Sequence, residues 1–379
     1  SFTVIPNSGS KAIAFVSPSQ TVNPGLATIT GTIPTQTVGV PFTVTAYAVD
    51  NYYNVEPDSA TAVTITSSDG AALTSGSNLF SNGQASYTID HRTSGNHTFT
   101  TSSALTDVVG VSYTVAPAVA GKLVFTTGSQ TLASLSCAGP LTIKTQDNYS
   151  NDSSVPSLTT ITMSAPPGVT LYSGAACTGP TNLYNIAANT SAQTFYFNST
   201  AGNAITITAV TGGLTSATQA HIITPYKLAN TSPSQIVQSG YCSAGAVTIK
   251  SQDSGSTDTV VLTTTAITLS GPTGTSFFTD SGCTANVGAI NINANTSATT
   301  YYFASALGNT ITLTANSGTM VNATKTHTLI PAKLAFVSPA QTVVSGVCVS
   351  AASTVQTQSQ NATATTIAAS TTINLSSKP

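Results

Sequence analysis

The sequence predicts an all-β protein made of tandem β-sandwich repeats of about 105 residues, arranged end to end. Two observations predict this class. Short runs with alternating apolar and polar residues, such as VTIKT, TITMSA, TFYFN and AITITAV, are separated by Gly, Pro, Asn and Asp, which is typical of strands in a sandwich or barrel. No helical period persists for three turns, and the same succession of strand-like runs recurs along the chain.

The composition supports a folded β protein and excludes several other classes. Charged residues make up only 5 % of the chain, the net charge is −2, hydrophobic residues make up 40 %, and Ser and Thr account for 119 of 379 residues. This hydrophobic content with little net charge does not fit a disordered chain, and no apolar run approaches the roughly 20 residues of a membrane-spanning helix. The chain has no basic cluster for nucleic acid or anionic lipid.

One line of sequence recurs four times and sets the repeat length. Lys122, Lys227 and Lys333 begin three of its copies at intervals of 105 and 106 residues, and Ala12 begins another 110 residues before Lys122. Because a period of this length marks repeat architectures, we expect the line to form the first strand of each unit, with SPxQ at its bend. The copies are AIAFVSPSQTVNPGLA (12–27), KLVFTTGSQTLASLSC (122–137), KLANTSPSQIVQSGYC (227–242) and KLAFVSPAQTVVSGVC (333–348).

These alignments divide the chain into five parts. We expect residues 1–6 to be the last strand of a preceding repeat, because SFTVIP parallels SYTVAP at 112–117. The first, second and third repeats follow at 12–117, 122–224 and 227–330, and 333–379 is the N-terminal part of a fourth. This pattern favours a segment of a longer array. The alternative is a subunit whose first strand completes a neighbour by strand addition.

The cysteines recur in register and predict disulfides within repeats. Cys137 and Cys177 are 40 residues apart, Cys242 and Cys283 are 41 apart, and Cys348 is the first cysteine of the fourth repeat, unpaired in this segment. This spacing does not suit a zinc site, which favours closely spaced pairs. Each cross-link would stabilise its repeat by roughly 4 kcal/mol in the chain-entropy account and implies an oxidising compartment. The alternative is two buried free thiols per repeat.

Two motifs resemble bacterial immunoglobulin-like repeats of the invasin and intimin type. VTAYAVDNYYNVEP at 44–57 is similar to that family's strand ending in an A-x-D-x-x-x-N turn, and SGNHTFTT at 94–101 is similar to its later strand pair. The resemblance implies immunoglobulin-like domains of large surface adhesins or extracellular fibres. The sequence departs from the pattern where Tyr53 replaces the usual Gly, and the third and fourth repeats (Asp253-Ser-Gly-Ser and Ser359-Gln-Asn) are expected to lose the turn's chemistry.

The titratable residues do not form a recognisable catalytic pattern, and we expect no enzymatic activity, catalytic residue or cofactor. His221 and His327 occupy equivalent strand ends, where backbone groups are expected to satisfy them. His91, beside Asp90 and Arg92, is expected in a solvated polar turn.

The repeats raise three further site hypotheses. The oxygen-rich turns at 50–54 and 147–152 are more typical of Asx turns than of Ca²⁺ sites, so no metal is expected. Lys144 and Lys250 are equivalent but lack counterparts for a recurring isopeptide bond. Ten Asn-x-Ser/Thr sequons occur, and the equivalent Asn189 and Asn295 are the candidate glycan positions.

The predicted function is a structural segment of an extracellular fibre or adhesin stalk at the cell surface. Linker prolines Pro117, Pro225 and Pro331 limit bending between repeats. The expected partners are neighbouring repeats or other copies of the protein, with surface glycans as a further candidate. The alternative is a binding module that recognises carbohydrate or a host or cell-surface protein through loops, with Tyr52 and Tyr53 as candidate contacts. The aromatic runs at 195–197 and 301–303 alternate as core strands do.

Overall fold

The computed structural model describes residues 5, 12–16, 19–57, 61–74, 76–102, 106–108, 112–348, 351–367 and 369–376. Within these ranges all regular structure is β, as predicted. No helix in the described part of the chain is long and apolar enough to cross a bilayer. The strand expected at 1–6 lies outside the described residues, apart from Ile5.

The first repeat is a sandwich of two five-stranded sheets, and its members are ordered here by hydrogen bonding. One sheet contains β11 (Thr106–Val108), β1 (Ala12–Val16), β5 (Phe42–Val49), β9 (Gln84–Asp90) and β7 (Leu73–Thr74). The other contains β4 (Gln36–Thr37), β12 (Ser112–Ala116), β10 (Gly95–Ser102), β6 (Ala62–Ser67) and β8 (Ser77–Leu79). A separate hairpin pairs β2 (Thr21–Asn23) with β3 (Thr28–Thr30).

The second repeat has two sheets of the same size. One contains β13 (Lys122–Phe125), β15 (Ala138–Gln146), β20 (Ala192–Ser199), β17 (Val169–Gly174) and β18 (Thr178–Pro180). The other contains β14 (Thr131–Ala133), β22 (Ala217–Thr224), β21 (Asn203–Val210), β16 (Thr159–Ser164) and β19 (Leu183–Ile186).

The third repeat has the same strand order as the second. One sheet contains β23 (Lys227–Asn230), β25 (Val247–Gln252), β30 (Ala298–Ser305), β27 (Thr275–Phe278) and β28 (Asn286–Val287). The other contains β24 (Ile236–Gln238), β32 (Ala323–Ile330), β31 (Asn309–Asn316), β26 (Thr265–Ser270) and β29 (Ala289–Ile292). In the last part of the chain, β33 (Lys333–Phe336) pairs with β34 (Val355–Gln358).

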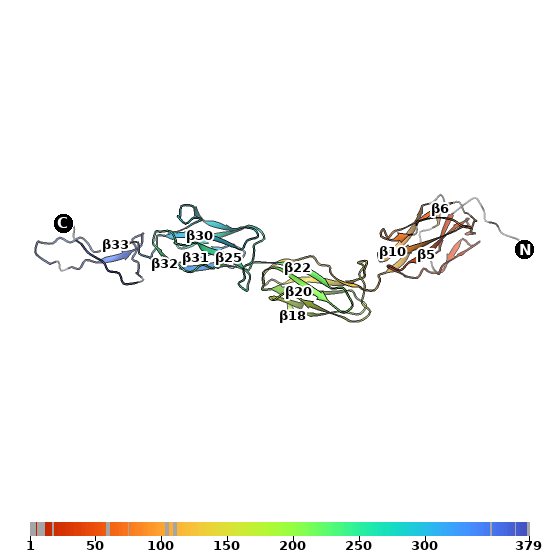
Figure 1. Ribbon diagram of the computed structural model, residues 1–379, viewed down its shortest axis with the longest axis horizontal. Coiled ribbons are helices and arrows are strands. Elements are labelled where there is room, and N and C mark those ends of the chain that lie inside the picture. Colours follow the sequence, from red (N-terminus) through yellow and green to blue (C-terminus); the bar gives the residue numbers. More distant parts are fainter. Residues whose placement is uncertain are drawn as a thin grey trace.

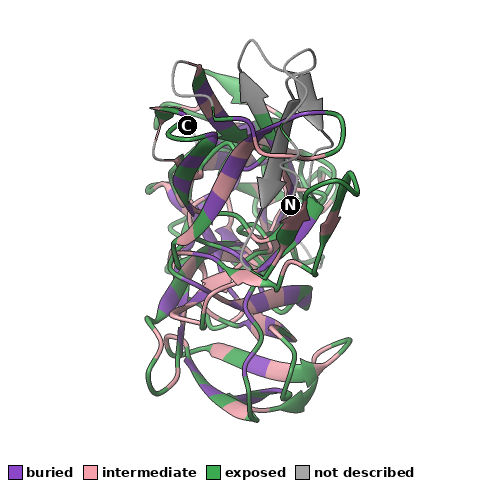
Figure 2. Cartoon of the chain, turned by 90° about the vertical axis from the view of Figure 1, so that its right-hand side faces the viewer, coloured by how far each residue is buried: buried purple, intermediate pink, exposed green. Residues whose placement is uncertain are grey.

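Each of the first three repeats has its own core, and the units follow one another in a row (Figure 1). Along the strands, buried and exposed residues alternate (Figure 2), because successive side chains point to opposite faces of a sheet. Phe195 and Phe197 are fully buried in the second repeat, and Tyr301 and Phe303 hold the equivalent places in the third. The aromatic runs are therefore core, which was the preferred interpretation of their alternation.

The recurrent line forms two strands rather than one, which corrects the sequence-based expectation. In the second repeat it supplies β13 to one sheet and β14 to the other, with the SQ segment between them. In the first repeat the line enters the β2–β3 hairpin instead, and the strand equivalent to β14 is β4, further along the chain. The alignment of residues 12–27 with the other copies of the line therefore corresponds to equivalent structure only as far as β1.

Candidate functional site: the junctions between repeats

The same tight turn occurs in all four repeats and lies at the junction with the preceding unit in the second, third and fourth. We call it the junction turn; it spans residues 50–54, 147–151, 253–257 and 359–363. Its first residue donates its N–H to the carbonyl of the fifth at 3.1, 2.9, 2.9 and 2.8 Å, and its fourth residue has positive φ in every copy. The fourth residues are Tyr53 (60°), Ser150 (74°), Ser256 (71°) and Ala362 (61°).

The third and fourth repeats keep this turn, contrary to the prediction that they lose it. Asp253 Oδ1 accepts the Thr257 N–H at 2.8 Å, as Asp147 Oδ1 accepts the Asn151 N–H at 2.9 Å. In the fourth repeat Ser359 Oγ takes the place of the carboxylate and accepts the Thr363 N–H at 3.2 Å. The turn depends on an oxygen acceptor at its first position, and a hydroxyl supplies one as well as a carboxylate does.

At the junction of repeats one and two, Asn151 holds the 91–94 loop of the first repeat. Its Nδ2 donates to the Arg92 carbonyl at 3.0 Å, and its Oδ1 accepts the Ser94 N–H at 2.9 Å. The linker is fixed to the same turn, because Asp147 Oδ2 accepts the Ala118 N–H at 3.0 Å. An amide that bridges a donor and an acceptor of one loop fixes both the position and the orientation of that loop.

The neighbouring side chain of the junction turn adds an aromatic contact. Arg92 lies over the ring of Tyr149, with its guanidinium carbon 4.6 Å from the ring centre. Gly39 faces the same ring, and a Cβ added at Gly39 would lie 2.6 Å from a ring carbon. Gly39 also has φ of 73°, so a side chain there would be both strained and obstructed.

The junction of repeats two and three uses different residues of the same turn. Ser134 Oγ accepts the Ser254 N–H at 3.3 Å and donates to Ser254 Oγ at 3.0 Å. Ser254 Oγ in turn donates to the Thr200 carbonyl at 3.2 Å. Asn203 Oδ1 accepts the Val260 N–H at 3.1 Å. A further contact comes from Asp253, whose Oδ2 accepts the Gly202 N–H at 2.8 Å.

Two of these contacts recur at equivalent positions in the junction between the third and the fourth repeat. Ser239, equivalent to Ser134, accepts the Gln360 N–H on its Oγ at 3.0 Å. Asn309, equivalent to Asn203, accepts both the N–H and the hydroxyl of Thr366 at 3.1 Å. These residues were not identified from the sequence. Their equivalence was nevertheless visible, because Asn203 and Asn309 lie in the matching segments GNAIT and GNTIT, and Ser134 and Ser239 follow the SQ residues of the recurrent line.

Glycines permit the close approach at both of these junctions. A Cβ on Gly202 would lie 2.0 Å from Thr259 Oγ1, and a Cβ on Gly308 would lie 2.1 Å from Thr365 Oγ1. Thr259 and Thr365 belong to the following repeat and are buried. Any larger residue at either glycine would push the two units apart.

Each of the two middle repeats carries a disulfide. The bonded pairs are Cys137–Cys177 and Cys242–Cys283, with Cα–Cα separations of 5.8 and 5.7 Å. In the second repeat the bond connects the start of β15 to the β17–β18 hairpin, and β20 lies between β15 and β17 in the sheet. Cys348 is free and exposed.

The expectation of a solvated turn around His91 was wrong. His91 is 1 % exposed and His97 is 8 % exposed, and their rings stack with centroids 4.9 Å apart. His91 Nδ1 lies 3.2 Å from Oδ2 of the buried Asp69, and His91 Nε2 lies 2.6 Å from the hydroxyl of Tyr113. Burial lowers the pKa of His91 despite the neighbouring Asp69 carboxylate, so its ring is neutral at pH 7.

His221 and His327 occupy equivalent positions in the last strands, but they lie within β22 and β32 rather than at the strand ends that the sequence predicted. A backbone group satisfies one ring nitrogen of each. Their Nδ1 atoms accept the N–H groups of Gln130 and Gln235, both at 3.1 Å. Their Nε2 atoms are buried without a hydrogen-bond partner. Burial lowers the pKa of both rings, which is what the loss of water around a cation does.

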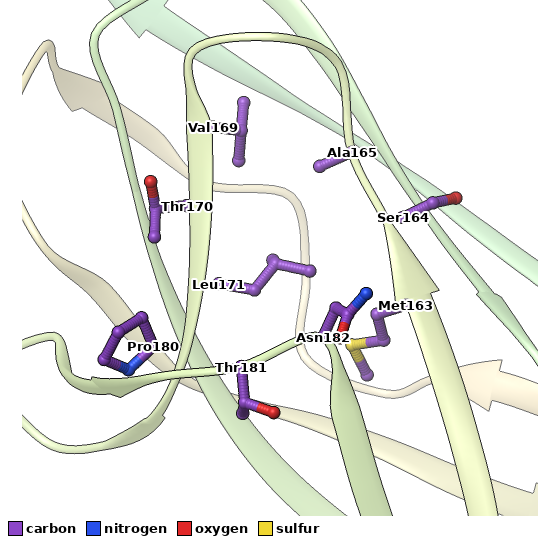
Figure 3. Close-up of a pocket in the computed structure, with 9 residues that line it drawn as sticks. All are labelled: Met163, Ser164, Ala165, Val169, Thr170, Leu171, Pro180, Thr181 and Asn182. Atoms are coloured by element: carbon purple, nitrogen blue, oxygen red, sulfur yellow. The ribbon is translucent and has the colours of Figure 1, made fainter.

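A groove of about 380 Å³ lies in the second repeat, between β16 of one sheet and β17 of the other (Figure 3). None of its nine labelled residues has a titratable side chain. They are Met163, Ser164, Ala165, Val169, Thr170, Leu171, Pro180, Thr181 and Asn182.

The other predicted positions lie on the surface. Asn189 and Asn295 are exposed and have φ of 61° in equivalent turns. Lys144 forms an ion pair with Asp152 at 2.5 Å, and both side chains are partly exposed. That setting is a solvated pair rather than a buried isopeptide centre. Tyr52 is 59 % exposed.

These features define a tandem array of immunoglobulin-like β-sandwiches joined by hydrogen-bonded turns. No protein-family model and no curated protein matches the sequence. Among solved structures, FdeC, an Escherichia coli adhesin, is similar over 86 % of this chain and 99 % of that one, with 13 % identity and a TM-score of 0.37. The Yersinia pseudotuberculosis protein InvD is similar over 84 % and 96 %, with 13 % identity and a TM-score of 0.30.

A β-glycosidase from Bacteroides vulgatus is similar over 57 % of this chain and 25 % of its own, with 11 % identity and a TM-score of 0.25. At these identities the likeness concerns fold alone.

Proposed function

We propose that the chain is a structural segment of an extracellular fibre or adhesin stalk. The observation that carries the proposal is the recurrence of the junction contacts. Ser134 and Asn203 each accept a backbone N–H of the third repeat, as Ser239 and Asn309 each accept one of the fourth. A protein whose repeats acted independently would not need equivalent hydrogen bonds at successive boundaries.

The disulfides and the surface support an extracellular position for this segment. Cross-links that close loops within the middle repeats persist in oxidising compartments and limit how far a repeat can extend under load. The chain has few charged residues and 119 Ser and Thr residues. The partners in this proposal are neighbouring repeats and other copies of the protein.

A binding role through Tyr52 is the second candidate, because this ring is exposed. Tyr52 occupies the same position in its junction turn as Tyr149, which lies beneath Arg92 of the preceding repeat. A contact with another repeat therefore explains the exposed ring as directly as a host ligand does. Replacing Tyr52 and Tyr53 by Ala separates the two, because a ligand contact predicts loss of adhesion and a stalk does not.

The stalk is tested by removing one whole repeat from the full protein in its source cell. Deletion of 227–332 connects Tyr226 to Lys333 and recreates a Pro-containing linker, so the second repeat meets the turn that the third repeat met before. We expect a fibre or stalk shortened by one unit, with cell attachment and distal activity retained. Loss of adhesion by a variant that remains folded and exposed at the surface would instead identify the third repeat as a binding module.

A further inference from the structure

The first repeat has no cysteine and therefore no disulfide. Its sandwich contains a buried cluster of polar side chains. Asp69 follows β6, His91 follows β9, and His97 lies in β10. One oxygen or nitrogen from each of the three lies within 4.8 Å of those of the other two, and all three residues are at least nine-tenths buried. The three residues come from both sheets, so a common ligand would join the two layers.

The hydrogen bonds around the two imidazoles leave one nitrogen of each facing the cluster. His97 Nε2 lies 2.8 Å from the Thr93 carbonyl, which can only accept, so Nε2 carries the proton and Nδ1 has a lone pair, 3.3 Å from the Ser68 hydroxyl. His91 Nε2 lies 2.6 Å from the Tyr113 hydroxyl. An oxygen that holds the distal nitrogen of a histidine is the usual companion of a metal-bound imidazole, because it fixes the ring and its tautomer.

The three side chains also form a donor set that suits a cation. A carboxylate and two imidazoles are typical ligands for zinc and related transition metals. Asp69 is already held in place, because its carboxylate accepts the N–H groups of Arg92, Thr93 and Ala71 and the Thr93 hydroxyl.

The existing spacing is close to that of a coordination shell. His91 Nδ1 and Asp69 Oδ2 are 3.2 Å apart. Two ligands at about 2.0–2.1 Å from a tetrahedral zinc ion lie roughly 3.3 Å apart. The exposed residue Ser68 lies beside the cluster, with its hydroxyl 3.3 Å from His97 Nδ1.

The other repeats have lost this cluster at the same strand positions. His97 pairs with Tyr113 across β10 and β12, whereas Ile205 pairs with His221 and Ile311 with His327 at the equivalent places. An isoleucine cannot bind a metal. Among the described residues the cluster therefore occurs in the first repeat, which has no cysteine, and the isoleucines occur in the two repeats that have a disulfide.

We propose that Asp69, His91 and His97 bind one divalent transition-metal ion, of the zinc class, which braces the first repeat in place of a disulfide. A water or the Ser68 hydroxyl completes the shell. The ion would also stiffen the 91–94 loop, whose Arg92 carbonyl and Ser94 N–H hold Asn151 of the second repeat. Metal binding and the first junction are therefore coupled.

The test begins with the full chain, stripped of metal with a chelator and titrated with zinc alone at neutral pH. We expect one zinc ion per chain by calorimetry and elemental analysis. With free zinc at about 100 times its Kd, the Tm of the first repeat should rise by roughly 10 °C, while the other repeats are unchanged. Cobalt substitution and X-ray absorption should report two imidazole ligands.

Matched variants separate coordination from simple packing. His97→Ile, which installs the residue of the other repeats, should abolish zinc binding and the Tm rise. His91→Ser, which removes the other imidazole, should do the same. His221→Phe in the second repeat is the control and should bind zinc as the wild type does. If the variants unfold, the cobalt spectrum of the wild type still decides. No heat of binding and no Tm shift in the wild type, or unchanged binding in folded His97→Ile, would overturn the proposal.

Discussion

Asn203 Oδ1 accepts the backbone N–H of Val260 at 3.1 Å, and these two residues belong to consecutive repeats. The same side chain donates from Nδ2 to the Asp258 carbonyl at 3.4 Å. One amide therefore contacts two backbone groups of the next unit. Because Asn309 occupies the same place one repeat later, the relationship can be tested at one junction with the other as the control.

Asn203→Ala should loosen the second junction without unfolding either repeat. Loss of its hydrogen bonds should weaken the free energy of interaction between the second and third repeats by about 1–2 kcal/mol. Spin labels at the exposed positions 206 and 312, in a Cys348→Ser background, should give a broader distance distribution in Asn203→Ala. Asn309→Ala, which affects the next junction, should leave that distribution unchanged. An equally narrow distribution in Asn203→Ala would mean that the linker alone sets the geometry.

Removal of the disulfide by Cys137→Ser with Cys177→Ser should lower the unfolding free energy of the second repeat by about 2–4 kcal/mol. The third repeat retains Cys242–Cys283 and serves as the internal reference. Urea unfolding of the oxidised proteins, followed by hydrogen exchange in each repeat, measures the effect. A reductant should destabilise both middle repeats and leave the first unaffected. Equal loss in the second and third repeats of the variant would contradict a local role.

The second and third repeats should lose stability as the pH falls below about 6.5. Burial lowers the pKa of His221 and His327 in the folded state, and Lys325 lowers that of His327 further. The unfolded chain therefore takes up protons before the folded chain does, so stability is full above the unfolded pKa and declines as the pH falls through it.

Thermal unfolding between about pH 7.5 and pH 5 measures this decline. His221→Phe should flatten the pH dependence of the second repeat and leave that of the third intact, although loss of the acceptor for the Gln130 N–H lowers its Tm at every pH. A pH dependence that persists in the second repeat of this variant would assign it to other groups.

The structure separates sequons that an enzyme can reach from one that it cannot. Asn189 and Asn295 are exposed, whereas Asn151 is 9 % exposed and engaged at the first junction. In a host that glycosylates Asn-x-Ser/Thr sites, glycopeptide mass spectrometry should find sugar at the two exposed positions and none at Asn151. Occupied Asn151 in a protein that retains its first junction would contradict this geometry.

The fold was readable from the sequence because its signals are local and repeated. Alternation around Phe195 and Phe197 predicted core strands, and the register of the cysteines indicated the same pairs that the structure joins. The turns were harder to predict. The absence of Asp from the fourth repeat's junction turn predicted the loss of the turn's hydrogen bonds. Ser359, the first residue of that turn, nevertheless accepts the backbone hydrogen bond that Asp accepts in the other repeats.

The junction contacts and the histidine cluster depend on long-range neighbours. Asn203 and Val260 are 57 residues apart, and Asp69 meets His91 from the opposite sheet, so no spacing rule connects them. A comparison of repeats offered one usable signal. His97 falls on a strand position occupied by Ile205 and Ile311, and a polar residue at a core position requires partners.

The equivalence of the second and third junctions has an evolutionary consequence. A unit that presents Ser134 and Asn203 at one end and a junction turn at the other can follow a copy of itself, so recombination can lengthen or shorten the chain by whole units without new compensating mutations. The first boundary is different, because Arg92 and Gly39 match Tyr149 and Asn151 specifically. Gene duplication is therefore free to act among the later units, while the order of the first two is fixed by their mutual fit.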